Sequence, residues 1–259
     1  MESATGDGNV KLTIQDNVAT ILLARPKQRN ALTMVMTDDL VRSLETAARS
    51  AEARVVVITG AGSAFCSGHD VNELMTLYSD SESSVVLPNA AGRVDGAIRS
   101  LPQPSLAIVN GPAMGMGCDI ALMCDLIIAS ESACFSELFV RRGLVPSAGT
   151  WLLPRIVGLR RAAQLLLTGE VIDAREAREW GIVNWVAPDS QLSARAQEVV
   201  DRLCALPAST LRYTKRALRQ SPDVSLDQLL EFVSFARSVD AKSGEAQKQG
   251  AAFLSARDV

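Results

Sequence analysis

Aromatic residues, histidine and long apolar runs are all scarce in this sequence of 259 residues. Aromatic side chains make up 4% of the chain and the net charge is −3, so we expect neither a base-stacking platform nor a basic surface for nucleic acid. The longest apolar runs, such as residues 55–59 and 126–129, fall far short of the roughly 20 residues that cross a bilayer. We therefore expect no nucleic-acid partner and no membrane span.

Metal-ligand patterns are also missing. The five cysteines are Cys66, Cys118, Cys124, Cys134 and Cys204. Their number is odd, no pair is spaced Cys-x-x-Cys, and a single histidine, His69, cannot complete a zinc site. Residues 1–9 lack the charged-then-apolar pattern of a signal peptide. These features predict a reduced, cytoplasmic protein without a metal.

A nucleotide cofactor is not expected either. Gly115-Met116-Gly117 follows an apolar run, as in a dinucleotide-binding turn, but Ile120 stands where the third glycine belongs. The sequence also contains no phosphate-loop Gly-Lys-Ser/Thr.

Apolar patterning predicts strands and helices in alternation over the first 190 residues and helices alone thereafter. The expected strands are 10–14, 18–23, 55–59, 106–109, 126–129 and 183–186. The expected helices are 35–50, 72–78, 93–101, 152–157, 160–167, 174–180, 192–205, 209–220, 226–238 and 244–255. Thr33 is expected to cap the first of these helices, and strands 10–14 and 18–23 are expected to form a hairpin around Asp16-Asn17. Residues 79–92 are serine-rich and acidic, which indicates a surface loop. The pattern predicts an α/β core over 1–190 and a helical part over 191–259.

Two glycine turns stand out, each following an apolar run and opening into a helix. One lies within residues 110–125 and the other within residues 64–71. A helix start presents unpaired N–H groups and a positive dipole end, which favour a negative oxygen. If both turns face one pocket, the N–H groups of His69 and Met116 form an oxyanion hole. The alternative is that the glycines only permit tight turns.

Several motifs resemble the crotonase superfamily, the enoyl-CoA hydratase/isomerase family. They are Ala24-Arg25-Pro26 with Asn30-Ala31-Leu32, Phe65-Cys66-Ser67-Gly68-His69-Asp70, Asn110-Gly111-Pro112 through Asp119, Cys124-Asp125, Gly143-Leu144-Val145-Pro146, Leu167-Thr168-Gly169, Ala174-Arg175-Glu176-Ala177 and Trp180-Gly181-Ile182-Val183. The match follows the family's order over nearly the whole chain. It implies a spiral of ββα units with a C-terminal helical region, 191–259, that forms trimers or dimers of trimers. In that region the resemblance makes Phe253 a candidate contact to a neighbouring subunit.

The resemblance also implies acyl-CoA thioester substrates, with coenzyme A as part of the substrate and no separate cofactor. The N–H groups of His69 and Met116 would hold the thioester oxygen of an enolate. The residues implied in coenzyme A binding are Lys27, Arg29, Ala31, Ser67, Gly68, Asp70, Val71 and Gly115. For Lys27 and Arg29, a solvated basic loop is the alternative. The His69 imidazole either covers the pocket mouth or acts on substrate.

The chain departs from the family pattern at the acids. Hydratases of the family carry two catalytic glutamates, and here those positions hold Asp119 and Phe139. A third position used as an aspartate by some members holds Ser147. We therefore expect one carboxylate, Asp119, whose alternative role is to stabilise a helix start. Glu137 is a substitute acid only if strand register points it the same way as Phe139.

These observations predict an enzyme of the hydratase/isomerase type. One carboxylate suits isomerisation or weak hydration, because water addition needs both a base and an acid. The alternatives are a crotonase-fold protein that binds acyl-CoA without turnover and, less favoured, a thioester hydrolase using Ser67, His69 and Ser147.

Overall fold

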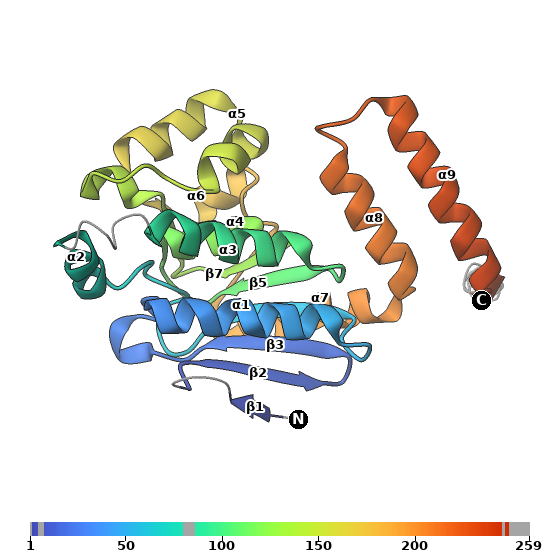
Figure 1. Ribbon diagram of the computed structural model, residues 1–259, viewed down its shortest axis with the longest axis horizontal. Coiled ribbons are helices and arrows are strands. Elements are labelled where there is room, and N and C mark those ends of the chain that lie inside the picture. Colours follow the sequence, from blue (N-terminus) through green and yellow to red (C-terminus); the bar gives the residue numbers. More distant parts are fainter. Residues whose placement is uncertain (1, 5–7, 80–85, 245–246, 249–259) are drawn as a thin grey trace.

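The computed structural model of the chain describes residues 2–4, 8–79, 86–244 and 247–248. A seven-stranded sheet in the order β1-β2-β3-β4-β5-β7-β10 forms its centre (Figure 1). Its strands are β1 (Glu2–Ala4), β2 (Val10–Gln15), β3 (Val18–Leu23), β4 (Val55–Gly60), β5 (Ser105–Val109), β7 (Leu126–Ser130) and β10 (Trp185–Ala187). The first three strands are antiparallel neighbours, and β3 to β10 pair in parallel.

Six of the seven strands overlap the predicted ranges, although β10 begins two residues later than expected, and β1 was not predicted. Asp16 and Asn17 both adopt positive φ, 49° and 67°, which suits the tight hairpin between β2 and β3. The β-branched run at the start of β4 is buried on both faces, as a central parallel strand requires.

Helices cover both faces of the sheet. On one face lie α1 (Met34–Arg49), α3 (Val86–Ser100) and α4 (Met116–Met123), and their apolar side chains share one core with the sheet. Thr33 caps α1 as predicted, because its side chain accepts a 3.1 Å hydrogen bond from the Met36 N–H. On the other face, α7 (Leu192–Ala205) packs against β4, β5 and β7.

A second, three-stranded sheet was not expected from the sequence. It joins β6 (Ala113–Met114), β8 (Cys134–Ser136) and β9 (Ile172–Asp173). Helix α6 (Ala174–Glu179) packs against β8 and β9, and the 3₁₀ turn η3 (Leu138–Arg142) packs against α5 (Gly149–Thr168). Helix α2 (Val71–Ser79) follows the first glycine turn. Gly158, at φ 76°, kinks α5, which explains the two shorter helices predicted there.

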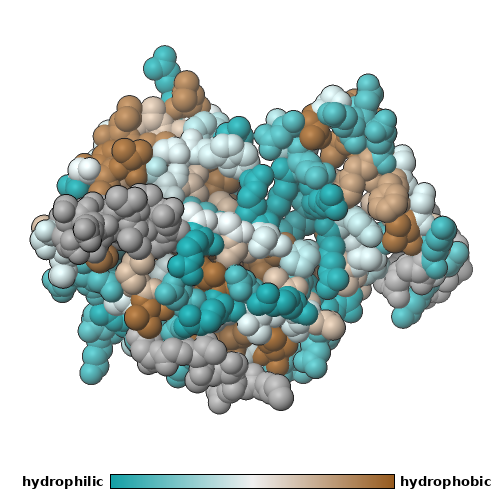
Figure 2. All heavy atoms as spheres, viewed as in Figure 1, coloured by the Kyte–Doolittle hydropathy of each residue, from teal (hydrophilic) through white to brown (hydrophobic). Residues whose placement is uncertain are grey.

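The last two described helices, α8 (Ala208–Gln220) and α9 (Leu226–Ser243), pair with each other and extend from the body (Figure 1). Figure 2 shows hydrophobic side chains exposed along them and over α5. The exposed apolar residues of these three helices include Ile156, Leu159, Leu167, Leu218, Leu226, Leu230 and Phe235. No helix in the described ranges is long and apolar enough to cross a bilayer.

The loop predicted at 79–92 was placed wrongly. Helix α3 already begins at Val86, because Pro88 in its first turn needs no hydrogen-bonded N–H and alanines follow. Residues 80–85, most of the helix predicted at 244–255, and Phe253 lie outside the described residues.

Candidate active site

The two glycine turns lie against each other. Gly68, at φ +88°, approaches the second turn so closely that a Cβ there would stand 2.8 Å from the Met114 carbonyl oxygen and 3.5 Å from the Met116 nitrogen. The Met114 N–H donates a 2.9 Å hydrogen bond to the Cys66 carbonyl, which ties the turns together. The Gly115 N–H donates at 2.7 Å to the Ser136 carbonyl and fixes the second turn to β8.

Two backbone N–H groups remain available at this junction. Met116 is the first residue of α4, so its N–H has no acceptor within the helix. Within the part of the chain that the structure describes, neither this N–H nor that of His69 donates a hydrogen bond. Both residues line one small pocket, whose other lining residues are Ser67, Gly68, Leu74, Gly115, Leu138, Phe139, Arg142 and Leu144.

The pocket is narrow and mostly apolar. Its free volume of about 10 Å³ corresponds to roughly one water molecule. The Phe139 ring lies over Gly115, with its Cζ 3.6 Å from the position a Cβ would take. Burial, and then the charge of Arg142, lowers the pKa of His69, so the imidazole is neutral at pH 7.

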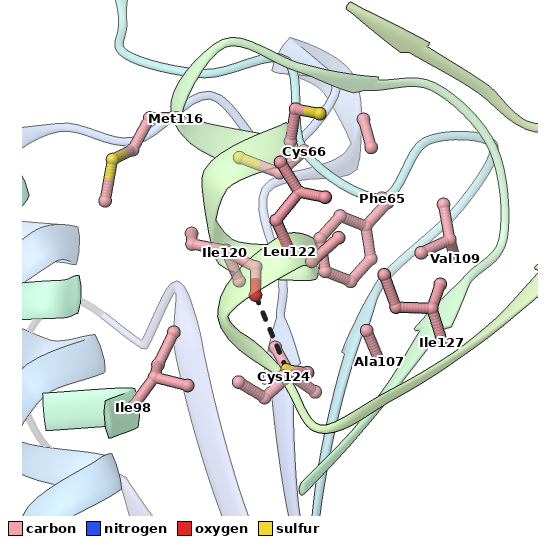
Figure 3. Close-up of a cluster of buried hydrophobic side chains, with 14 of the residues drawn as sticks. Phe65, Cys66, Ile98, Ala107, Val109, Met116, Ile120, Leu122, Cys124 and Ile127 are labelled. Atoms are coloured by element: carbon pink, nitrogen blue, oxygen red, sulfur yellow. Dashed lines mark hydrogen bonds between the residues drawn. The ribbon is translucent and has the colours of Figure 1, made fainter. Parts of the chain in front are cut away.

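Hydrophobic packing holds α4 in place (Figure 3). Ile120 and Leu122 of α4 are buried in one cluster with Phe65 and Val109. The buried thiols of Cys66 and Cys124 have pKa values raised to about 12 by burial, so neither is a nucleophile at neutral pH. All five cysteines are free.

Asp119 lies one turn after Met116 on α4 and is fully buried. Its Oδ1 accepts a 2.6 Å hydrogen bond from the Gly149 N–H, and its Oδ2 is buried without a hydrogen-bond partner. Burial raises the pKa of Asp119 well above its usual range, and the nearby carboxyls of Glu137 and Asp95 raise it further. The buried carboxyl of Asp119 therefore favours its protonated, uncharged form.

Glu137 lies beside Asp119 because both carboxyls contact Gly149. It follows β8 as the N-cap residue of η3, with φ −91° and ψ 57°, so the strand register on which its prediction depended does not extend to Phe139. The buried Glu137 carboxyl lies against Gly149, where an added Cβ would stand 2.8 Å from the Glu137 Cδ. The Phe139 ring instead lies against Gly115. Burial raises the pKa of Glu137 to about 7, with the Cys118 thiol opposing the shift and Asp95 adding to it.

A third carboxyl, Asp95 on α3, was missed by the sequence reasoning. The Ser147 hydroxyl donates a 3.0 Å hydrogen bond to its Oδ2. Burial raises the pKa of Asp95 to about 6 even though the Ser147 bond opposes this. Asp95 is on the same helix face as the buried Ala91 and Ile98, and that spacing was the signal available. The prediction of a single carboxylate at this site was therefore wrong.

The segments predicted to bind coenzyme A adjoin each other. The Ser67 N–H donates to the Arg29 carbonyl at 3.0 Å, and the Leu32 N–H to the Gly68 carbonyl at 2.8 Å. Lys27, Arg29 and Val71 are exposed, whereas Ala31 is buried. Asp70 is committed elsewhere: its carboxylate pairs with Arg25 at 2.7 Å and accepts from the N–H groups at the start of α2.

The serines and histidine considered for hydrolysis do not form a catalytic pair. The Ser67 hydroxyl makes a long, 3.4 Å hydrogen bond to the Gln28 carbonyl, and the Ser147 hydroxyl is taken by Asp95. Among the described residues, neither serine bonds to His69, so the predicted hydrolytic arrangement is not assembled here.

Known proteins resemble this chain in both sequence and structure. Residues 13–257 match the family described as enoyl-CoA hydratase/isomerase. The chain is 31% identical to 1,2-epoxyphenylacetyl-CoA isomerase of Escherichia coli over 94% of each chain, and 34% identical to 2,3-dehydroadipyl-CoA hydratase of the same organism over 82% of each. The enoyl-CoA hydratase structure from Bacillus anthracis superposes with a TM-score of 0.90 at 30% identity, covering 95% of this chain and 96% of that one. The chain has the crotonase fold and belongs to the enoyl-CoA hydratase/isomerase family.

Proposed function

We propose that this protein is an enzyme that moves a carbon–carbon double bond in an enoyl-CoA thioester. One observation carries the proposal: two free backbone N–H groups line one apolar pocket, and Asp119, one helical turn after Met116, lies buried beside a second buried carboxyl, Glu137. The relatives named as acting on acyl-CoA compounds support the thioester as substrate class.

The N–H groups of His69 and Met116 bind the thioester oxygen. Loss of a proton from the carbon chain puts negative charge on this oxygen, and donors fixed in advance stabilise that charge. One such donor contributes about 3 kcal/mol to the transition state in comparable oxyanion holes. The His69 imidazole is neutral and is not needed for this step.

Asp119 and Glu137 move the proton. One ionised carboxyl takes a proton from the carbon next to the double bond, the double bond shifts, and a proton returns at its far end. The pair gains one proton and gives one back, so no water is consumed. Two buried carboxyls that share one proton provide the base and the acid together.

The pocket favours isomerisation over hydration. Phe139 covers Gly115 at the position where hydratases of the family hold a second glutamate, and an aromatic ring cannot activate water. The rest of the pocket lining is mostly apolar, so apart from Asp119 and Glu137 the site offers little to activate a water molecule.

The substrate's coenzyme A part binds along the hydrogen-bonded segments 25–32 and 67–71. Lys27 and Arg29 are exposed there and offer positive charge to phosphates. The subunit associates as a trimer or hexamer through α8 and α9, whose apolar residues, such as Leu230 and Phe235, stand exposed. Light scattering tests this: a monomer at micromolar concentration contradicts it.

The enzyme assay uses a 3-enoyl-CoA and crotonyl-CoA, following conjugated-enoyl absorbance and free thiol. We expect a gain of conjugation from the 3-enoyl-CoA. Loss of conjugation from crotonyl-CoA would indicate a hydratase, and release of free thiol would indicate a hydrolase. Binding of acyl-CoA without any of these changes would indicate a carrier. Each of these three results would overturn the proposal. Asp119→Asn should lower kcat by about 10²–10⁴-fold. His69→Ala should retain turnover within about tenfold, since the backbone donor persists.

A further inference from the structure

Three carboxyls from separate parts of the chain converge on the start of α5. The Gly149 N–H donates to Asp119 of α4, and the Ser147 hydroxyl, two residues earlier, donates to Asp95 of α3. The Glu137 carboxyl lies against the same glycine from the segment after β8. One short stretch, residues 147–149, therefore organises all three acids.

The cluster lacks compensation. Four of its carboxyl oxygens are buried without hydrogen-bond partners: Asp95 Oδ1, Asp119 Oδ2 and both oxygens of Glu137. Over the described ranges, no lysine, arginine or histidine forms an ion pair with any of the three. The favourable groups here are neutral or partial charges: the positive ends of α4 and α5, the Gly149 N–H, the Ser147 hydroxyl and the Cys118 thiol. A buried carboxyl without a cationic partner is stable in its protonated, neutral form, and each ionised neighbour makes the next ionisation harder. The three acids therefore do not all ionise together.

Asp95 differs from the other two. It is the least buried of the three, and it alone accepts a hydroxyl hydrogen bond, from Ser147. A hydrogen bond to the charged form favours ionisation. As the pH rises, Asp95 therefore ionises before the deeper pair, and its charge then acts on Asp119 and Glu137.

We propose that Asp95 is a positioning residue of the acid–base site: held by Ser147 at the start of α5, its negative charge makes Asp119 and Glu137 keep one proton between them. This rests on the proposed isomerisation, which needs one base and one acid at once. Some members of the family have an acid at the position of Ser147. Here the carboxylate of Asp95, from α3, hydrogen-bonds to that serine instead. The groups facing Asp119 are thus Glu137, Asp95, the Cys118 thiol and the Gly149 N–H.

The first test is the pH profile of isomerisation. Removing a negative charge lowers the pKa of neighbouring acids, so Asp95→Asn should move both limbs of the kcat/KM profile toward acid by about one pH unit. Ser147→Ala removes the hydrogen bond that stabilises ionised Asp95, so it should move both limbs of the profile toward acid by a smaller amount. Asp95→Glu should restore the wild-type profile. Glu52→Gln removes an exposed charge far along the chain and serves as the control.

A limb position unchanged by Asp95→Asn, or displaced toward alkaline pH, overturns the proposal, since a structural role predicts a lower rate without a shift. The second test needs no turnover: carboxyl-carbon NMR titration of the substrate-free protein. The titrations of Asp119 and Glu137 should move to lower pH in Asp95→Asn, and unmoved titrations overturn the role of Asp95. If wild-type protein isomerises no enoyl-CoA, the proposed function fails while this titration still decides the role of Asp95.

Discussion

The backbone N–H of Gly149 donates a 2.6 Å hydrogen bond to Oδ1 of Asp119, so the first residue of α5 holds the buried acid of α4. The same glycine has no room for a side chain, because the Glu137 carboxyl occupies that space. Gly149 therefore sets the separation between the two acids of the site.

Gly149→Ala should disturb the acid pair. The new Cβ would stand 2.8 Å from the Glu137 Cδ, so the carboxyl must move within a packed interior. We expect a loss of about 1–3 kcal/mol in the free energy of unfolding, measured by urea titration, together with reduced kcat. Adding Glu137→Asp, which withdraws the carboxyl by one carbon, should recover part of the stability. A double variant no more stable than the single one would contradict the contact as the cause.

Glu137→Gln should change how stability depends on pH. In the unfolded chain Glu137 ionises near 4.5, while burial raises its pKa to about 7 in the folded protein. Between these pH values the unfolded state releases a proton that the folded state keeps. The wild-type free energy of unfolding therefore falls as pH rises from about 4.5 to about 7, by up to roughly 3 kcal/mol.

The glutamine variant lacks this proton, so its stability should fall less over the same range in urea titrations. The exposed Glu52→Gln should keep the wild-type slope. Parallel curves for wild type and Glu137→Gln would show that Glu137 ionises normally in the folded protein.

Gly68→Ala should separate the two oxyanion donors. At φ +88°, alanine is strained, and its Cβ would press on the Met114 carbonyl at 2.8 Å. We expect a kcat loss of about 10²–10³-fold and a stability loss of about 1–3 kcal/mol. Gly181→Ala is the matched control, because Gly181 has φ +84° but open space around it. Equal kcat losses in both variants would assign the effect to backbone strain alone.

Asp70→Asn should loosen the join between the two coenzyme A segments. Its ion pair with Arg25 lowers the pKa of Asp70, so the stabilisation is present at neutral pH and is lost as pH falls through that lowered pKa. We expect a loss of about 1 kcal/mol at pH 7 that shrinks below about pH 4 in urea titrations. Glu198→Gln breaks the exposed pair with Arg195 and should lose less. A pH-independent loss would point to packing rather than charge.

Coenzyme A binding gives a second readout of the same variant. The Asp70 carboxylate pairs with Arg25 and holds the two coenzyme A segments together. Asp70→Asn should therefore raise the Kd for coenzyme A a few-fold in calorimetry, which corresponds to about 1 kcal/mol. Lys27→Ala and Arg29→Ala should weaken binding at low salt and less at high salt, as exposed charges do.

The sequence by itself determined the family, the β2–β3 hairpin, the α1 cap at Thr33 and the two glycine turns. These features depend on local chemistry: alternation within a strand, a capping hydroxyl, and backbone conformations that favour glycine. They are written in consecutive residues and need no knowledge of distant neighbours.

Only the tertiary structure decided the acid chemistry. Along the sequence, Asp119 stands alone beside Phe139 and Ser147, where acids are missing. In space, the chain brings Asp95 from α3 and Glu137 from the end of β8 to the start of α5. Burial and mutual repulsion raise the pKa values of these carboxyls. Both effects arise between residues far apart in the chain, so no local sequence pattern contains them.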